Sequence, residues 1–325
     1  FQIGLVDILF ALGITPDGIV GHSVGELGCA YADGCFTAEQ MILAAHARGR
    51  ASIETDTIDG KMAAIGLGYN QMKEMLADYP SIEIACHNAS DSCTLSGPTA
   101  DVEAMVEKLV ADGVFARSVN VANIAYHSRY IAPAAPKLLE YLKEVIPDPK
   151  PRSSKWVSSS ILQDAWDSPL AQTSSPEYHT NNLLSSVYFE EASAHIPQNA
   201  ICIEIAPHGL LQAILKRSLV AKEVINVPLT LRSVPDGVKF LFQSLGKLYL
   251  NGLELNLSPM YPEIEFPVSR GTKPLGQFLD WDHSSPYPLK DMNLQVSATE
   301  NSGSGRYSMC MKDYCIKQMF VTTPN

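Results

Sequence analysis

The serine in Gly21-His22-Ser23-Val24-Gly25 is the residue of this sequence with the clearest chemical potential. The spacing G-x-S-x-G is typical of a nucleophile elbow, a sharp turn from a strand into a helix that exposes the serine hydroxyl. Small residues two places away on each side allow that turn. The Val24 amide and the N-terminus of the following helix can then stabilise an oxyanion. The ordinary alternative is a glycine-rich turn with an exposed serine.

A serine hydroxyl becomes a useful nucleophile only when a base accepts its proton. The histidines available for this role are His22, His46, His87, His127, His179, His195, His208 and His283. His22 adjoins the serine, and neighbouring side chains on an elbow point apart, so we expect a structural role for it. His127, on a loop in IAYHSR, and His208, just past a buried strand in EIAPHG, are equal candidates by position.

A hydrolase-like order of serine, acid and late histidine offers another arrangement of the same elbow. It would require His208 or His283 as the base, together with a carboxylate. The acids available for it are Asp164, Asp167 and Glu204. Nothing in the spacing favours this arrangement over one based on His127.

Composition limits the class of protein. The chain has 325 residues, with 46% hydrophobic and 18% charged residues, which is typical of a globular protein with a full core. A formal net charge of −11 argues against nucleic acid or an anionic membrane as the main partner. No apolar run reaches the length of a membrane helix, and no signal peptide is recognisable. Seven cysteines without a CxxC pair predict a reduced, cytoplasmic protein without structural zinc.

The elements that would position these residues alternate between helix and strand. Residues 18–21 are expected to form a short buried strand and residues 24–32 a helix, which is the context that the elbow requires. Residues 61–121 predict the order β-α-β-β-α-β, a compact ferredoxin-like insert in a larger α/β layer. Further helices are predicted over 2–12, from 37 past 50, and over 131–145, 210–219 and 236–251, with strands over 201–205 and 225–229. Thr37 with Gln40 three places on is a capping-box pattern that predicts the start of the second of these helices.

Several segments, taken in order over about residues 1–290, resemble the acyltransferase domain of the animal fatty acid synthase. The segments that carry the resemblance are GHSVGE (21–26), LAAHARGR (43–50), IAYHS (124–128), PRSSKW (151–156), EIAPHGLLQAILKR (204–217) and WDHS (281–284). The resemblance implies an α/β-hydrolase-like core with a parallel sheet, interrupted by the ferredoxin-like insert.

The resemblance also implies a domain organisation. The core would comprise residues 1–60 and 123–230, and the insert residues 61–122. Residues 231–290 would form a terminal helix and a proline-rich linker that docks on a neighbouring ketosynthase domain. Residues 291–325 would be a flexible or aberrant tail. Because the chain opens with Phe1, we expect a piece of a longer protein, with the family's second oxyanion donor on a glutamine-bearing loop upstream.

The activity that the resemblance implies is transfer of malonyl and acetyl groups from coenzyme A to the phosphopantetheine thiol of acyl carrier protein, with no metal or redox cofactor. Ser23 matches the nucleophile and His127 the catalytic histidine, which decides between His127 and His208. In this family a main-chain carbonyl, not an acid, orients that histidine. Arg48 matches the arginine that holds the malonyl carboxylate.

Three further positions complete the expected site. The Val24 amide would contribute to the oxyanion hole. Tyr126, where the family usually has a phenylalanine, and His22 are expected to line the substrate site.

Two other functions remain compatible with the residues. A serine hydrolase or thioesterase would use the same elbow but admit water, and would therefore turn over without a thiol acceptor. A non-catalytic docking fragment of a fatty acid synthase would use the proline-rich residues 258–290 to hold a neighbouring domain.

Overall fold

The computed structural model describes residues 1–263 and 265–267, and the chain divides into two units. The first unit runs from Phe1 to Asn256, and the second begins at Leu257. The described part of the second unit contains the short 3-10 helix η5 (Ser258–Met260). Among the described residues, no helix has the length and apolar character needed to cross a membrane.

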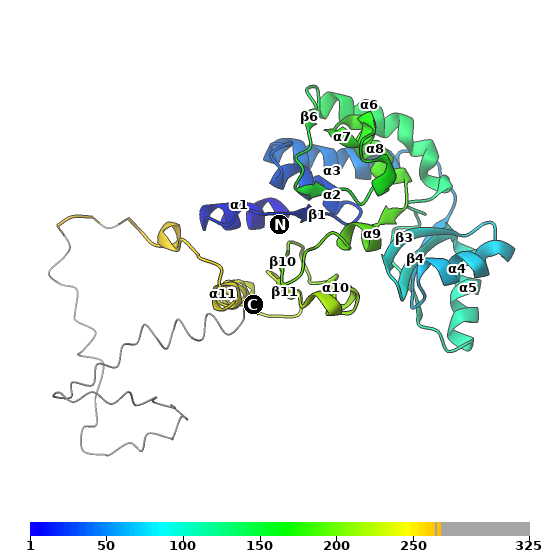
Figure 1. The fold of residues 1–325 in the computed structure, drawn as a ribbon. Helices are drawn as coiled ribbons and strands as arrows, with labels where there is room; N and C mark the ends of the chain where they lie inside the picture. Colours follow the sequence, from blue (N-terminus) through cyan, green and yellow to red (C-terminus); the bar gives the residue numbers. More distant parts are fainter. Residues whose placement is uncertain (264, 268–325) are drawn as a thin grey trace, which may run out of the picture. The chain divides into compact units, whose positions relative to one another are not determined.

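Helices and strands alternate through the first unit (Figure 1). The first elements are α1 (Gln2–Ala11), β1 (Ile19–Val20), α2 (Gly25–Ala32) and α3 (Ala38–Ile53). The next are β2 (Gly60–Ile65), α4 (Tyr69–Met75), η1 (Leu76–Asp78), β3 (Glu83–Ala89), β4 (Ser92–Pro98), α5 (Thr99–Ala111) and β5 (Ala116–Val119). Apart from η1, these match the predicted elements, with ends that differ by a few residues.

The remaining elements of the first unit follow the insert. They are η2 (Arg129–Ala134), α6 (Ala135–Val145), β6 (Lys150–Pro151), β7 (Trp156–Val157), η3 (Gln163–Ala165), α7 (Pro169–Gln172), β8 (Thr173–Ser174), α8 (Pro176–Leu184), β9 (Val187–Tyr188), α9 (Phe189–Ser193), β10 (Ile201–Glu204), α10 (Gln212–Ser218), η4 (Val220–Lys222), β11 (Ile225–Pro228) and α11 (Gly237–Leu250). The elements between β7 and β10 lie in a stretch for which the sequence analysis predicts none.

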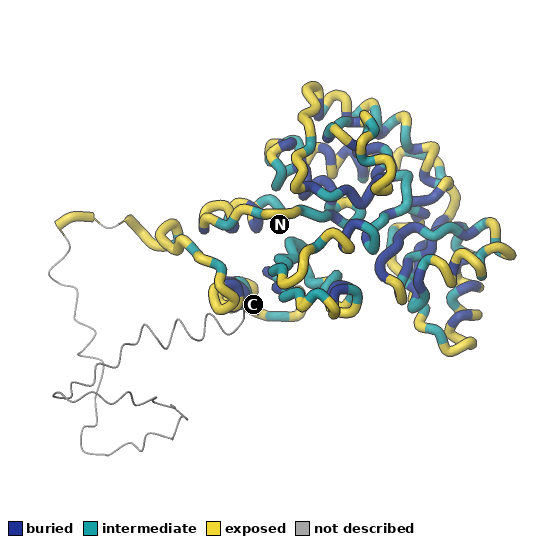
Figure 2. The backbone as a smooth tube through the Cα atoms, viewed as in Figure 1, coloured by how far each residue is buried: buried dark blue, intermediate teal, exposed yellow. Residues whose placement is uncertain are grey.

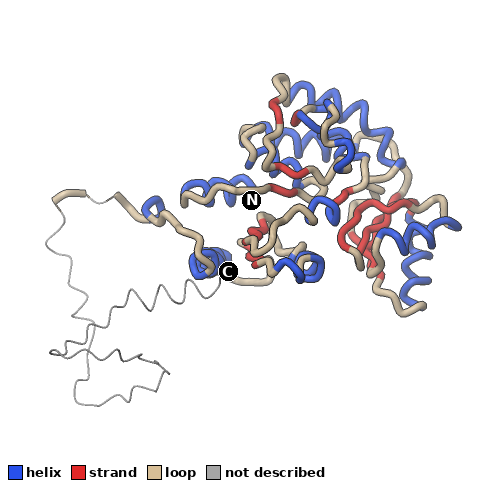
Figure 3. The backbone as a smooth tube through the Cα atoms, in the orientation of Figure 1, coloured by secondary structure: helices blue, strands red, loops and turns tan. Residues whose placement is uncertain are grey.

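The insert is built on a five-stranded sheet with the strand order β5-β2-β4-β3-β9. Its own four strands pair antiparallel, and β9, which comes from outside the insert, pairs parallel with β3. Helices α4 and α5 cover one face (Figures 1 and 3). Alternating residues of the sheet, such as Ile65 and Leu95, pack there against Val102 and Met105 of α5. We keep the ferredoxin-like description as an interpretation of this element order.

The parallel pairing expected in the core takes the form of two separate two-stranded ladders. Strand β1 pairs with β7, and β10 pairs with β11. The mixture of helices with these strands confirms an α/β fold. A single continuous parallel sheet is not present among the described residues.

A second core lies among α2, α3, α6 and α8, as the dark segments of Figure 2 show. Ala30 on α2 and Ala44 on α3 belong to this core and are completely buried, and such small side chains let helices pack closely. Helix α3 begins at the predicted capping box, in which the Thr37 hydroxyl accepts from the Gln40 amide and the Gln40 side chain accepts from the Thr37 amide. Helix α8 begins at Ser175, whose side chain accepts from the Tyr178 amide.

The last helix belongs to the first unit. Ser244 of α11 donates a hydrogen bond to the Pro228 carbonyl of β11 at 2.8 Å. The expected segment 231–290 joins this helix to the linker, whereas the first unit contains all of α11 and ends at Asn256. Most of the predicted linker and the whole predicted tail lie outside the described residues.

Candidate active site

The serine lies on a strained turn between β1 and α2. Ser23 has a φ of 53°, in the left-handed region that residues with a side chain rarely adopt. A Cβ at Gly21 would lie 2.7 Å from the Glu26 amide nitrogen and 2.8 Å from Cys29 Sγ, so only glycine fits there. A Cβ at Gly25 would meet nothing within 4 Å, so the expected crowding exists on one side of the serine only.

His127 lies beside this serine. Its Nε2 is 2.6 Å from Ser23 Oγ, and its Nδ1 is 2.9 Å from the Ser185 carbonyl oxygen. Because a carbonyl can only accept, Nδ1 carries the proton and Nε2 of the neutral ring holds a lone pair toward the serine hydroxyl. The pair can therefore move a proton from Ser23 to His127.

The environment keeps this imidazole neutral. Burial, and secondly the positive charge of Arg48, lower the pKa of His127 to about 3. Its backbone has a φ of 55°, so both members of the pair lie on strained loops. At physiological pH the ring is available as a proton acceptor.

Arg48 reaches the same point from α3. Its Nη1 donates to Asn182 Oδ1, and its Nη2 is 3.5 Å from Ser23 Oγ. Burial lowers the pKa of Arg48 to about 10, which still leaves the guanidinium charged at neutral pH. No carboxylate of the described residues forms an ion pair with it. The site thus presents a buried cation whose counter-ion is missing from the described chain.

The Val24 amide follows the serine directly. Within the described part of the chain this amide donates to no protein acceptor, whereas the next amide, of Gly25, donates to the His22 carbonyl. Val24 precedes the first residue of α2, so its N–H belongs to the unsatisfied donors of that helix N-terminus. It can donate to a bound oxygen.

The other two expected site residues occupy different surroundings. His22 points away from Ser23, as expected for neighbours on an elbow, and its Nε2 is 2.9 Å from Asn88 Oδ1 of β3. Tyr126 is half-buried and packs against both the helical core and the apolar cluster beneath β3. Both side chains therefore lie where the elbow meets the insert.

Asn182 is part of the site, and sequence reasoning did not find it. Besides accepting from Arg48, its Nδ2 donates to the Ser23 carbonyl at 3.2 Å and to Ser160 Oγ at 2.7 Å. The residue that follows this helix, Ser185 at the C-terminus of α8, accepts the hydrogen bond from His127 through its carbonyl oxygen. Predicting the helix over 176–184 and the short strand after it would have drawn attention to this segment. The residues NNLLSS themselves match no functional motif.

Glu26 is a second residue that the sequence analysis did not single out. It is completely buried in the first turn of α2 and accepts from Trp156 Nε1 at 3.0 Å, the Ser159 amide at 2.9 Å and the Tyr178 hydroxyl at 2.5 Å. Burial raises the pKa of this carboxyl. The contacts fasten the helix that follows Ser23 to β7 and α8.

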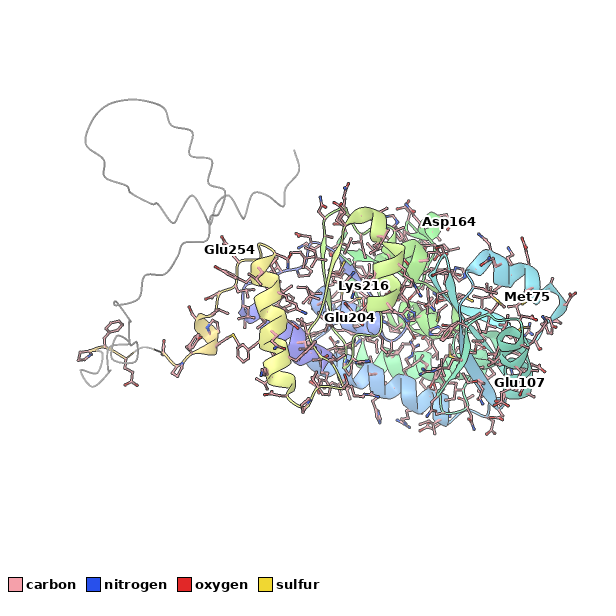
Figure 4. The ribbon with its side chains drawn as sticks, turned by 90° about the horizontal axis from the view of Figure 1, so that it is seen from below. Met75, Glu107, Asp164, Glu204, Lys216 and Glu254 are labelled. Atoms are coloured by element: carbon pink, nitrogen blue, oxygen red, sulfur yellow. The ribbon has the colours of Figure 1, made fainter. Side chains whose placement is uncertain are left out.

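Of the alternative arrangement, His208 and Glu204 make hydrogen bonds elsewhere, and His283 lies outside the described residues. His208 Nδ1 accepts from the Arg232 amide at 3.3 Å. Glu204, labelled in Figure 4, accepts from the Leu211 amide at 2.9 Å and from Gln212 Nε2 at 3.0 Å, next to α10. Asp164, also labelled there, is exposed on η3. In the part of the chain that the structure describes, no group of three or more potential ligands is arranged to hold a metal ion.

The chain is similar to known acyltransferase and polyketide synthase sequences. Residues 1–254 match the model of the acyl transferase domain family. A highly reducing polyketide synthase of Aspergillus nomiae is 32% identical over 292 residues, which cover 87% of this chain and 12% of that protein. A low-reducing polyketide synthase of Aspergillus calidoustus is 34% identical over 301 residues, which cover 88% of this chain and 12% of that protein. The chain thus spans about an eighth of these relatives, and they are polyketide synthases, so the resemblance to the animal fatty acid synthase is supported only at the level of the acyltransferase domain.

Solved structures share the fold. The acyltransferase domain from module 8 of the salinomycin polyketide synthase superposes with a TM-score of 0.69 at 20% identity, covering 78% of this chain and 59% of that one. The acyltransferase domain of the polyketide synthase PpsC of Mycobacterium tuberculosis gives a TM-score of 0.58 at 25% identity, covering 70% of this chain and 71% of that one.

Proposed function

The chain belongs to the acyl transferase domain family, and on that premise we propose that it moves malonyl, and secondarily acetyl, from coenzyme A to the phosphopantetheine thiol of an acyl carrier protein. We place it in a cytoplasmic synthase of the polyketide or fatty acid type, beside a ketosynthase domain. The similarity to fungal polyketide synthases supports the synthase setting, since these relatives are much longer proteins of that type.

One observation carries the proposal: Ser23 Oγ lies 2.6 Å from the imidazole of His127 and 3.5 Å from the guanidinium of Arg48. The imidazole activates the hydroxyl, and the guanidinium lies where a carboxylate on the acyl group would reach it. Because a planar guanidinium matches a carboxylate with two parallel hydrogen bonds, a dicarboxylic acyl group such as malonyl supplies the missing counter-ion.

In the first half-reaction His127 Nε2 accepts the proton of Ser23 while Oγ attacks the thioester carbonyl carbon. The tetrahedral oxyanion accepts a hydrogen bond from the Val24 amide. Collapse breaks the carbon–sulfur bond, and the departing coenzyme A sulfur takes the proton from His127. The carbonyl of Ser185 holds the imidazole in the required orientation throughout.

The second half-reaction runs through the same groups in reverse. His127 accepts the proton of the acyl carrier protein thiol, and the sulfur attacks the acyl-serine ester. When the intermediate collapses, Ser23 regains its proton from His127. These steps need no metal and no redox cofactor.

Intact-protein mass spectrometry after incubation with malonyl-CoA tests the proposal. We expect a mass gain of one malonyl group that maps to the peptide containing Ser23 and persists until a thiol acceptor is added. Ser23→Ala should abolish the gain, since the hydroxyl is the bond-forming group. Label retained at the parent level by that variant would refute the nucleophile assignment.

The same experiment separates the alternatives. A hydrolase would release free malonate without an acceptor and accumulate little acyl-serine. A docking fragment would take up no label under any condition.

A further inference from the structure

The side chain of Asn182, close to the end of α8, has every polar atom engaged within the site. It is 2% exposed. Its Oδ1 accepts from Nη1 of Arg48, and its Nδ2 donates to the Ser23 carbonyl at 3.2 Å and to Ser160 Oγ at 2.7 Å. Because a guanidinium only donates and a carbonyl only accepts, a side chain that joins them must offer both an acceptor and a donor. An amide meets this requirement, whereas a carboxylate lacks the donor.

The same turn of the chain also holds the base. The Leu183 carbonyl accepts from the His127 amide at 3.3 Å, and the Ser185 carbonyl accepts from His127 Nδ1 at 2.9 Å. Nucleophile, base and cation are thus all hydrogen-bonded to residues 182–185. A change at Asn182 can therefore disturb all three groups, so its specific role has to be read from a quantity that separates charge from position.

Asn182 gives the buried cation of the site an uncharged partner. None of the ion pairs in the described chain includes Arg48. A guanidinium has several N–H donors, of which Asn182 accepts from one group, Nη1. The other, Nη2, lies 3.5 Å from Ser23 Oγ, which is at the limit of a hydrogen bond. The positive charge and most of the donors of Arg48 are therefore left for a carboxylate on the acyl group.

We propose that Asn182 is a positioning residue that sets the preference for malonyl over acetyl. It holds the guanidinium beside Ser23 through an uncharged oxygen, so the acyl carboxylate meets no competing anion at Arg48. A carboxylate at position 182 would form that ion pair within the protein and remove the advantage of a charged acyl group. The inference rests on the proposed malonyl transfer and extends it to a residue that acts through Arg48.

The variants Asn182→Asp and Asn182→Ala separate charge from position. Both lose the donor to Ser23 and Ser160, and they differ in the charge placed next to Arg48. Each variant is incubated briefly with equal concentrations of malonyl-CoA and acetyl-CoA, and intact-protein mass spectrometry measures the two acyl-serine yields. Since only folded protein takes up label, the ratio of the two yields does not depend on the folded fraction of the sample.

In Asn182→Asp the ratio of malonyl to acetyl label should fall by about tenfold or more, with acetyl label still formed, because an internal charge-assisted pair replaces the pair with the substrate. Asn182→Ala should lower both labels and keep the ratio close to that of the parent chain. Asn181→Asp is the matched control. Asn181 Nδ2 donates to the Ser160 carbonyl at 3.0 Å, so this variant makes the same chemical change on the same helix without a contact to Arg48, and the ratio should stay close to the parent value.

Three results would overturn the inference: an unchanged ratio in Asn182→Asp, no acetyl label in that variant, or a similar fall of the ratio in Asn182→Ala or Asn181→Asp. Each of them leaves the proposed function intact as long as the parent chain forms malonyl-serine. A parent chain that forms none would refute the proposed function instead.

Discussion

The loops around Ser23 and the insert built on β2 to β5 differ in backbone strain and in the charged groups that they bury. The non-glycine residues with positive φ in the described chain are Ser23, Ala122, Asn123, His127, Asn199 and Glu223. Four of these six belong to the elbow or to the loop that carries His127, and none lies between residues 60 and 119. The site also buries Arg48 and Glu26, whereas the helix-facing core of the insert is apolar.

The difference shows where strain is tolerated. A left-handed residue and a buried cation both cost free energy, and they persist only when the surrounding structure fixes them. Here Glu26 ties α2 to β7 and α8, while Asn182 ties Arg48 to the elbow. The insert meets no such demand and, apart from register shifts in β3, packs as a sheet with two helices. Changes in the first region should therefore affect chemistry, and changes in the second should affect stability.

The largest expected effect is on the base. His127→Ala should slow formation of the acyl-serine by about 10²–10⁴-fold, because no other imidazole of the described chain contacts Ser23. His208→Ala, whose imidazole contacts the Arg232 amide, should slow it far less. Rapid-quench measurement of label uptake from malonyl-CoA checks both. The reverse ranking would move the base to His208.

The next effect concerns the insert. Leu95 is fully buried in the sheet, so Leu95→Ala should lower the free energy of unfolding by about 2–5 kcal/mol through lost packing and a cavity. Val110 on α5 is 56% exposed, and Val110→Ala should change the free energy of unfolding by about 0.5 kcal/mol or less. Urea titration measures both. Equal losses would show that the insert core is not the stabilising element we infer.

A smaller effect tests the cation of the site. Arg48→Ala should lower malonyl transfer by at least about tenfold, since a charge-assisted pair contributes roughly 1.5–3 kcal/mol, and should spare or improve acetyl transfer. Arg50, two residues along α3, is partly exposed and bonded to Glu54 at 2.7 Å, so Arg50→Ala is the matched control. Steady-state rates with malonyl-CoA and acetyl-CoA measure the ratio of malonyl to acetyl transfer for each variant. A uniform loss would make Arg48 structural.

The smallest effect tests the strain itself. Ser23→Gly should be no less stable than Ser23→Ala, because glycine adopts positive φ without a steric penalty and this offsets its greater entropy when unfolded. At the exposed helical position Ala104, the change to glycine should cost about 1 kcal/mol. Thermal unfolding of the three variants measures the contrast. A similar loss at both positions would mean that the elbow is not strained.

The sequence alone was sufficient for features that depend on nearby residues. The G-x-S-x-G spacing predicted the elbow, Thr37 and Gln40 predicted the capping box, and the apolar pattern of residues 61–121 predicted their strands and helices. These succeed because a turn, a cap or an amphipathic face is decided within a few residues. The segment around residues 157–200 lacks such periodicity, so α8 and its contribution to the site went unpredicted.

Only the tertiary structure decided which residues meet. His127 is 104 residues from Ser23 in the chain and 58 from the Ser185 carbonyl that orients it, and Asn182 is 134 from Arg48. By position His127 and His208 were equal, and the resemblance alone separated them. Asn182 carried no signal at all, since an asparagine shows its role only when its partners surround it. Contacts between residues so far apart in the chain depend on how α2, α3 and α8 pack. The spacing of neighbouring residues in the sequence does not determine that packing.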